Sequence, residues 1–358
     1  MSSHFYKLRV KDIKRETADC VSISFDIPEN LRPEFAFREG QNITIRKIIG
    51  GNDVRRSYSI CSAPYENELR IAVKKVDCGV FSTFATEELK INDELEILSP
   101  MGTFYSKGDD VKGHFLAIAA GSGITPVISI IKHTLATKPQ INFTLVFGNK
   151  TRSSIIFFEQ LEALKNKYMS RFNFINILSR EQTDNAIQHG RITPEKLNEL
   201  DKIIDYSTIN RVFICGPERM IFSCNEYFRN KGFSKDRIHF ELFTIPGETV
   251  SQITTSTVVE KGNKDLSDIT VKVDGRSFDF KLARDGSSIL DAALALNIDL
   301  PFACKGGVCC SCRAYIEEGT VEMDSNFALD DDEVEAGFVL TCQSHPTSGK
   351  VTVDFDVK

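Results

Sequence analysis

The sequence has no tryptophan and only six histidines among its 358 residues. The histidines are scattered and none has the spacing of a metal ligand, so a histidine-based metal site is not expected. No apolar run is long enough to span a bilayer, and the N-terminus carries no hydrophobic export segment. These absences argue against a membrane or exported protein and favour the cytoplasm.

Basic residues are fewer than acidic residues, 44 against 50. The formal net charge is −6, so neither a nucleic-acid partner nor an anionic membrane surface is expected. A hydrophobic content of 41% is enough for ordinary packed cores, and the length predicts two or three domains.

Cysteine, by contrast, is plentiful, with ten residues. Near the C-terminus the segment C-K-G-G-V-C-C-S-C has the spacing C-x4-C-x2-C, and a fourth cysteine follows after 29 further residues. This is the plant-type spacing for a 2Fe–2S cluster, whose two irons need four converging thiolates. The predicted ligands are Cys304, Cys309, Cys312 and Cys342.

Two other uses of these cysteines are weaker. A zinc site usually has paired C-x2-C knuckles, whereas the last cysteine here stands alone. Disulfides are not expected in a protein that is not exported. Cys310 is surplus to the motif, and we interpret it as a bystander because its use as a ligand would break the x4 spacing.

The chain divides into segments of different pattern. Residues 1–106 have short alternating stretches and turns, which predict an antiparallel β-barrel. Residues 107–243 alternate apolar strands with helical patterns, which predicts a parallel sheet covered by helices. Residues 244–268, rich in Thr, Ser, Gly and Lys, are interpreted as a flexible linker, and residues 269–358 as a ferredoxin-like module.

Individual elements can be placed within these segments. Strands are expected at Gln41–Arg46, Leu69–Val73, Phe115–Ala120, Phe143–Phe147, Phe172–Leu178, Val212–Cys215, Ile269–Val273, Ser277–Phe280 and Val351–Phe355. Helices are expected at Phe84–Leu89, Pro126–Ala136, Ser153–Tyr168, Pro194–Leu200, Glu218–Lys231 and Ser288–Leu296. Turns are expected at Gly50–Asp53 and at Asp274-Gly275.

Two pieces of the first segment together favour a flavin site. In Arg56-Ser57-Tyr58-Ser59, an arginine can neutralise a diphosphate, an aromatic ring can stack on an isoalloxazine, and a hydroxyl can reach a ring nitrogen. By itself this could equally be a strand with one aromatic residue. The second piece, Gly79 to Thr83, precedes a helical stretch, and small residues there leave N–H groups free for a phosphate.

A dinucleotide site is indicated in the second segment. Gly121-Ser122-Gly123-Ile124-Thr125-Pro126 joins a strand to a helix, where glycines let a pyrophosphate approach the helix N-terminus. Cys215-Gly216-Pro217 ends a later strand, and both loops fall on the carboxyl edge of the sheet. Either loop alone could be a tight structural turn, and Cys215 alone a buried core thiol.

With these motifs in order, the chain resembles the ferredoxin–NADP reductase superfamily, in the form with a C-terminal plant-type ferredoxin domain. The resemblance also rests on Gly40-Gln41, Pro100–Phe104 and Glu241-Leu242-Phe243, and it covers nearly the whole chain. It implies a multidomain fold with a flavin-binding barrel, an α/β nucleotide domain and an α+β β-grasp ferredoxin domain.

The resemblance also implies roles for individual residues. Arg56 would hold the diphosphate of FAD, Tyr58 would stack on the flavin, and Ser59 would approach N5. The turn that caps the diphosphate, with Cys78 where the family often has glycine, would comprise Gly79, Val80, Phe81 and Ser82. The resemblance also implies that Thr125 and Cys215 flank the nicotinamide and that Phe243 lies near the flavin.

Ser179 and Arg180 follow a predicted strand, and relatives specific for NADP place such a pair on the ribose 2′-phosphate. This favours NADPH over NADH, although a solvated loop is the simpler interpretation. An acidic stretch precedes Cys342 and can be an ordinary first helical turn or a docking face for a basic partner; it comprises Asp330, Asp331, Asp332, Glu333 and Glu335.

The implied function is transfer of electrons from NADPH through FAD to the cluster and on to a multicomponent oxygenase. The arrangement is most similar to reductases that serve phenylacetyl-CoA epoxidase in phenylacetate catabolism, so a di-iron oxygenase is the expected partner. Alternatives are a Rieske aromatic-ring oxygenase, a hydroxylase or a desaturase as partner. From another class, a non-catalytic redox sensor whose flavin site has decayed is also compatible with the cluster.

Overall fold

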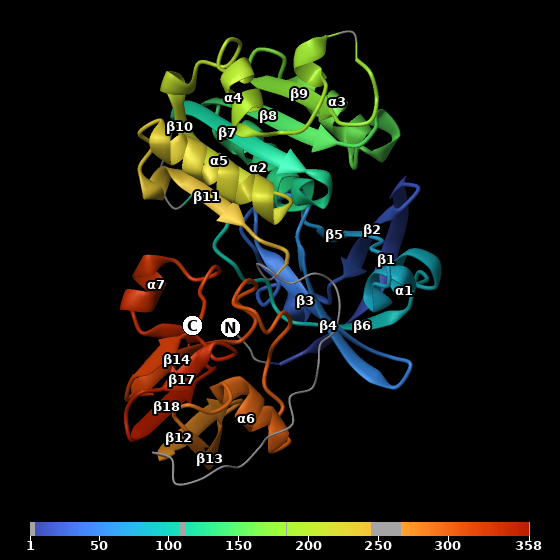
Figure 1. Cartoon of the computed structure of the whole chain (residues 1–358). Coiled ribbons are helices and arrows are strands. Elements are labelled where there is room, and N and C mark those ends of the chain that lie inside the picture. Colours follow the sequence, from blue (N-terminus) through green and yellow to red (C-terminus); the bar gives the residue numbers. More distant parts are fainter. Residues whose placement is uncertain (1–3, 107–111, 184, 245–265, 358) are drawn as a thin grey trace.

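The computed structural model describes residues 4–106, 112–183, 185–244 and 266–357. It contains three domains, two of which have the barrel and parallel-sheet architectures predicted, while the third has a mixed sheet (Figure 1). The predicted linker, apart from residue 244 and its last three residues, lies outside the described part of the chain.

The first domain is an antiparallel barrel with the strand order β4-β3-β6-β1-β2-β5. A bridge between Ile60 and Ile71 brings the two ends of this sheet together. Alternate residues such as Leu8 and Val10 point into its core. The strands are β1 (Tyr6–Thr17), β2 (Cys20–Asp26), β3 (Asn42–Ile49), β4 (Asn52–Ser59), β5 (Leu69–Lys74) and β6 (Glu94–Ile97).

One helix of this domain differs from the prediction. Helix α1 (Val80–Glu87) begins four residues earlier than the expected Phe84, so the predicted phosphate-binding turn forms its first turn, with Gly79 as the N-cap. The hairpin turn between β3 and β4 is also shorter than predicted, because Asn52 and Asp53 already belong to the strand.

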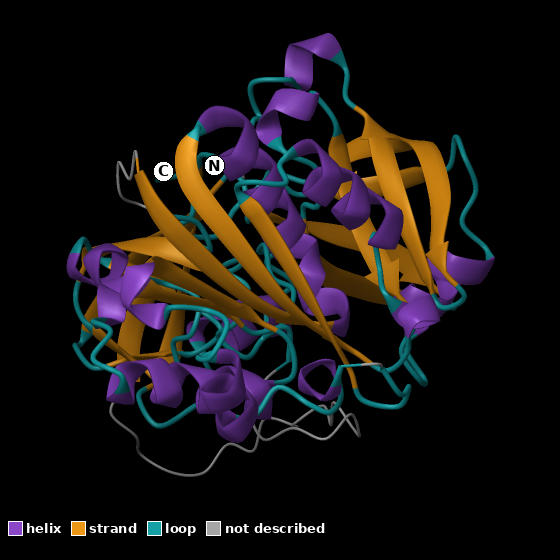
Figure 2. Ribbon diagram, turned by 90° about the horizontal axis from the view of Figure 1, so that it is seen from above, coloured by secondary structure: helices purple, strands orange, loops and turns teal. Residues whose placement is uncertain are grey.

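The second domain is a parallel sheet with the order β11-β10-β7-β8-β9. Its central strand is buried on both faces: Phe115 and Ala117 pack with α2 and α3, whereas Leu116 and Ile118 pack with α4 and α5. Helices therefore cover both faces (Figures 1 and 2). The elements are β7 (Lys112–Ala120), α2 (Ile124–Thr137), β8 (Gln140–Asn149), α3 (Phe158–Lys167), β9 (Phe172–Leu178), α4 (Pro194–Leu200), β10 (Ile209–Cys215), α5 (Glu218–Asn230) and β11 (Ile238–Glu241).

The predicted continuous helix Ser153–Tyr168 is wrong at its start. Residues Arg152–Ser154 form a short 3-10 turn, and Phe157 has a positive φ of 61°, which breaks the helical path before α3 begins. The remaining 3-10 segments are η1 (Glu29–Leu31), η2 (Pro64–Glu66), η3 (Gly121–Gly123), η5 (Ala186–Gln188), η6 (Tyr206–Thr208) and η7 (Lys235–Arg237).

The third domain is a mixed sheet with the order β13-β12-β18-β14-β16, in which β12 and β18 are parallel. Strand β12 begins at Leu266, three residues before the predicted module start, and Asp274-Gly275 forms the expected hairpin turn with positive φ. The elements are β12 (Leu266–Val273), β13 (Arg276–Ala283), α6 (Ile289–Ala295), β14 (Arg313–Glu318), β15 (Val321–Met323), α7 (Asp331–Glu335), β16 (Phe338–Leu340), β17 (Ser344–Pro346) and β18 (Lys350–Asp354).

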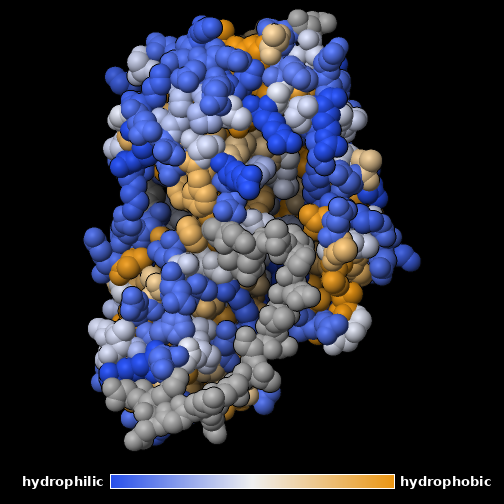
Figure 3. Space-filling model, viewed as in Figure 1, coloured by the Kyte–Doolittle hydropathy of each residue, from blue (hydrophilic) through white to orange (hydrophobic). Residues whose placement is uncertain are grey.

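The three domains pack against one another. The face of the molecule in Figure 3 is mostly hydrophilic, and hydrophobic residues show mainly toward its middle. None of the helices in the described ranges is long and apolar enough to cross a membrane.

Candidate functional site

The four predicted cluster cysteines converge on one loop of the third domain. The Cys304 thiol interacts with those of Cys309 and Cys342, and Cys342 in turn interacts with Cys312. The described residues include no group of three or more His, Cys, Asp or Glu side chains placed for a single metal ion. The four thiols instead adjoin one another in the series Cys309, Cys304, Cys342 and Cys312.

The loop backbone suits a cluster. The amide of Gly306 donates to Cys304 Sγ at 3.3 Å, and the amide of Cys304 donates to Cys309 Sγ at 3.4 Å. Such N–H groups stabilise the negative charge of cluster sulfurs. Gly307 has a φ of +75°, and a Cβ there would lie 2.7 Å from the carbonyl oxygen of Ser325, so the close turn requires glycine. The residues present therefore fit a 2Fe–2S group.

Cys310 points away from this set. Its thiol donates to the carbonyl of Ala328 at 3.1 Å, and burial raises the pKa of the thiol well above its usual range. The geometry agrees with its interpretation as a bystander.

The predicted flavin residues lie together on β4 and at the start of α1. Arg56 is exposed, and its Nη1 donates to the Arg55 carbonyl at 2.7 Å. Ser57 Oγ donates to Asn42 Oδ1 at 2.8 Å, and the ring of Tyr58 lies 5.5 Å from that of Phe81. An open cation, an aromatic face and a hydroxyl on one strand could hold a flavin diphosphate and ring.

The turn at the start of α1 is tightly built. A Cβ at Gly79 would lie 2.3 Å from Ser82 Oγ, so no side chain fits there, and Cys78 adopts a φ of 60°. The Phe81 side chain is buried in the barrel core and Val80 is exposed. Both side chains are apolar, so these two residues could contact a phosphate through their backbone N–H groups, as the sequence interpretation expects.

Two predicted loops of the nucleotide domain adjoin at the carboxyl edge of the sheet. A Cβ on Gly123 would lie 2.1 Å from the Cys215 carbonyl oxygen, so glycine permits this approach. Thr125 is buried and its Oγ1 donates to the Ser122 carbonyl at 3.0 Å. Gly121 has a positive φ, Gly216 lies against Ala120, and Pro217 is the N-cap of α5. This open edge could hold a dinucleotide.

Cys215 is fully buried, and burial together with the nearby Glu241 carboxylate raises the pKa of its thiol well above the usual value. Phe243 is 42% exposed, two residues after β11. Ser179 and Arg180 follow β9, where their backbone N–H groups donate to the carbonyls of Asn149 and Lys150.

A residue that sequence reasoning did not assign to the site is Glu241. It ends β11 beside Cys215, and its Oε2 accepts a hydrogen bond from Ser59 Oγ at 3.0 Å, which joins the nucleotide domain to the barrel. Burial raises the pKa of Glu241 to about 7, against opposing hydrogen bonds from Ser59 and Asn42. Its place at the end of the last parallel strand was the available signal.

The third domain borders the site. A cavity of ≈ 1040 Å³ lies between all three domains, and Asn42, Glu241, Cys309 and Cys310 are among its lining residues. The buried hydroxyls of Thr44 and Ser311 are 2.7 Å apart, so the cluster loop touches β3 of the barrel. The predicted flavin and cluster sites are therefore neighbours.

Comparisons with known proteins agree with this architecture. Residues 7–105 match the model of the oxidoreductase FAD-binding domain, residues 117–226 the oxidoreductase NAD-binding domain, and residues 271–347 the 2Fe-2S iron-sulfur cluster binding domain.

Full-length relatives are also found. The chain is 41% identical over 356 residues to one of the subunits of 1,2-phenylacetyl-CoA epoxidase from Escherichia coli, covering 99% of this chain and 98% of that one. It is 32% identical to the ferredoxin reductase component of 3-ketosteroid-9-alpha-monooxygenase from Rhodococcus rhodochrous, covering 97% and 96%. The fold matches phthalate dioxygenase reductase with a TM-score of 0.60 at 21% identity, over 99% of this chain and 100% of that one.

The three matched domains follow one another in the predicted order, and the first two relatives extend over almost the whole chain. The chain therefore belongs to the ferredoxin–NADP reductase superfamily of oxidoreductases, in the form that joins FAD-binding and NAD-binding domains to a C-terminal 2Fe–2S ferredoxin domain.

Proposed function

We propose that this protein is the NADPH-dependent reductase component of a multicomponent oxygenase, and that its partner is the di-iron phenylacetyl-CoA epoxidase of phenylacetate catabolism. The observation that carries the electron path is the contact of the cluster loop with the barrel strand β3, beside Ser59 and Glu241. The partner is supported by the 41% identity, over the full chain, to a component of such an epoxidase.

A bound FAD would supply the conversion between hydride transfer from a dinucleotide and the single-electron transfer that a 2Fe–2S cluster requires. Arg56 would neutralise the diphosphate, the first turn of α1 from Gly79 to Ser82 would cap it, and Tyr58 would face the flavin ring. Ser59 Oγ and Glu241 Oε2 would hold or accept a proton at the flavin edge. Thr125 and Cys215 would position the nicotinamide, with Phe243 nearby, and the cluster would be held by Cys304, Cys309, Cys312 and Cys342.

We place this activity in the cytoplasm. None of the ten cysteines forms a disulfide, as expected in a reducing compartment.

The electron path predicts a simple spectroscopic result. The purified protein should show flavin and cluster bands in the visible spectrum, and anaerobic NADPH should bleach both. A protein that shows cluster bands that NADPH leaves unchanged would instead act as a redox sensor with a decayed flavin site.

The partner is tested by reconstitution with the purified oxygenase. We expect NADPH consumption coupled to epoxidation of phenylacetyl-CoA. Coupling to a Rieske-type oxygenase alone would leave the proposed electron path in place but would contradict the role in phenylacetate catabolism. A different oxygenase partner is the second candidate because the chain is 32% identical to the reductase component of a 3-ketosteroid monooxygenase.

The preference for NADPH gives a further prediction. Arg180 is exposed after β9. The carboxylate of the neighbouring Glu181 accepts a hydrogen bond from the backbone N–H of Arg152 at 2.8 Å, so it is engaged with another residue and not with Arg180. Arg180→Ala should raise the KM for NADPH by about tenfold, since a charge-assisted hydrogen bond contributes roughly 1.5–3 kcal/mol. The KM for NADH should stay unchanged. Arg276→Ala, on the exposed hairpin of the third domain, is the matched control, and equal losses with both dinucleotides would refute the 2′-phosphate role.

A further inference from the structure

The docking of the ferredoxin domain on the barrel depends on one buried arginine that the predicted site did not include. Arg55 precedes Arg56 on β4, and adjacent residues of a strand point to opposite faces. Arg56 is exposed on the flavin-facing motif, whereas the Arg55 side chain is only 3% exposed. The strand thus offers one cation to each side.

Arg55 is enclosed by the ferredoxin domain. Its Nη1 donates to the Leu300 carbonyl at 2.9 Å, and its Nη2 donates to Asp299 Oδ1 at 2.8 Å. The guanidinium carbon lies 4.3 Å from the centre of the Phe302 ring, which is cation–π geometry. A carbonyl, a carboxylate and an aromatic ring from the segment 299–302 therefore surround a single cation of the barrel.

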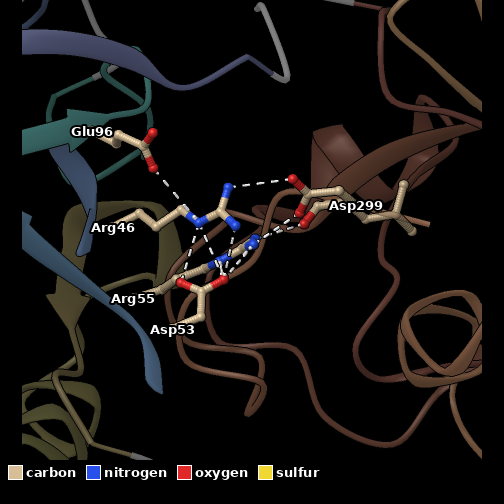
Figure 4. A network of polar contacts seen from close by, with 6 residues as sticks. Arg46, Asp53, Arg55, Glu96 and Asp299 are labelled. Atoms are coloured by element: carbon tan, nitrogen blue, oxygen red, sulfur yellow. Dashed lines mark hydrogen bonds and ion pairs between the residues drawn. The ribbon is translucent and has the colours of Figure 1, made fainter. Parts of the chain in front are cut away.

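The charges around this contact come mostly from the barrel (Figure 4). Asp53 Oδ2 accepts from both Arg55 at 2.9 Å and Arg46 at 3.1 Å, and Glu96 pairs with Arg46 at 3.7 Å. Asp299, which also pairs with Arg46 at 3.3 Å, supplies the acid from the other domain. Burial opposes the charge of Asp53, yet hydrogen bonds from Arg55 and Arg46 hold its pKa below the usual value.

Further contacts join the ferredoxin domain to the barrel domain. Ser311 of that loop meets Thr44 of β3, and Leu98 and Met101 of the barrel domain pack into the ferredoxin core. Removing Asp299 would leave the buried Arg55 with Asp53 as its one carboxylate partner among the described residues, and Asp53 is already shared with Arg46. An under-compensated buried charge is strongly unfavourable. Separation of the domains would return Arg55 to water.

We propose that Arg55 and Asp299 form an ion-pair clamp that fixes the ferredoxin domain with its cluster loop against the barrel, and that Arg55 is a positioning residue for electron transfer between the two domains. The inference rests on the proposed electron path. If the clamp forms, it determines the rate of cluster reduction. Added salt should weaken the clamp, because screening reduces the attraction between charges that are partly open to solvent.

The test uses the full-length holoprotein in anaerobic stopped-flow mixing with NADPH. Asp299→Asn keeps the shape of the side chain and removes its charge. We expect flavin bleaching at the wild-type rate and cluster bleaching about tenfold slower, a loss of about 1.4 kcal/mol. In the wild type, added salt should slow cluster bleaching, and this salt dependence should diminish in the variant. Glu317→Gln, which removes an exposed ion pair with Lys272 inside the ferredoxin sheet, should behave as wild type.

A double-mutant cycle shows whether the two residues act through each other. Arg55→Met should slow cluster reduction at least as much as Asp299→Asn, and the double variant should be no slower than Arg55→Met alone. Additive losses, or an Asp299→Asn variant with wild-type cluster kinetics, would overturn the clamp.

Hydrogen exchange keeps this test independent of the proposed function. If the domains separate more often, the backbone amides of Leu300 and Phe302 should exchange several-fold faster in Asp299→Asn than in wild type. Unchanged exchange contradicts the clamp even if NADPH reduces neither cofactor. Failure of NADPH to reduce the wild type, with exchange changed as expected, would refute the proposed electron path and leave the clamp standing.

Discussion

Replacing Cys342 by serine is expected to abolish electron delivery to cytochrome c, which depends on the cluster, and to leave flavin reduction intact. Cys342 follows β16 and reaches the thiols of Cys304 and Cys312 from outside the cluster loop. With three thiolates the loop cannot complete the coordination of two irons, because each iron needs two of the four cysteines. We expect cytochrome c reduction to fall by about two orders of magnitude or more, since no other route through the cluster remains.

The measurements are iron and acid-labile sulfide content, the EPR signal of the reduced cluster, and NADPH oxidation with ferricyanide, which can take electrons from the flavin directly. The ferricyanide activity should remain near the wild-type level. Loss of both activities would mean that Cys342 is needed for folding rather than for the cluster alone.

Cys310→Ser is the matched control for this prediction. Its hydroxyl can donate to the Ala328 carbonyl as the thiol does at 3.1 Å, so the loop should keep its shape and its cluster. A variant Cys310→Ser that loses iron, together with a Cys342→Ser that retains it, would contradict the ligand assignment.

Much of this architecture could be predicted because the signals are local. Each signal depends on a short stretch of chain: the spacing of the cysteines, the glycines at positions 121 and 123, and the alternation of strands and helices. In the structure Gly123 lies against the Cys215 loop, and each of the four cysteines lies next to at least one other of them. The helix predicted from Ser153 failed because Phe157 adopts a left-handed conformation that periodicity does not reveal.

The contacts between domains could not be predicted. Arg55 and Asp299 are 244 residues apart, and neither has a local pattern that distinguishes it from an ordinary surface charge. Glu241 likewise meets Ser59 across 182 residues. These pairings arise from the packing of three folded domains. The periodicity of a single sequence carries no information about which residues of different domains come into contact.

Glu241 gives the second large effect, which is a dependence on pH. With the pKa of Glu241 raised to about 7 by burial, the carboxylate becomes ionised, and able to accept a proton through Ser59 Oγ, as pH rises through about 7. Turnover with a cluster-dependent acceptor should therefore rise across this range. Glu241→Gln should lose that inflection and be slower at pH 8 by about a hundredfold, the lower end of what a positioned acid–base group contributes. Glu29→Gln, which changes an exposed glutamate in the barrel domain, should keep the wild-type profile.

Stability should change with pH in the opposite direction, and this separates the proton role from a structural one. The pKa of Glu241 in the folded protein lies above the ordinary glutamate value of 4.5, so folding is unpenalised below pH 4.5 and loses free energy as pH rises from there to about 7. A rise from 4.5 to about 7 corresponds to roughly 3–4 kcal/mol. Partial access of solvent to the Glu241 side chain lowers the expected effect to roughly 2–3 kcal/mol. Urea unfolding should show Glu241→Gln to be more stable than wild type at pH 8 and equal to it near pH 4. If Glu241→Gln is slower but not stabilised at pH 8, the Glu241 carboxylate is well solvated in the folded protein. Its pKa would then not be raised, and the predicted inflection of turnover near pH 7 would have another origin.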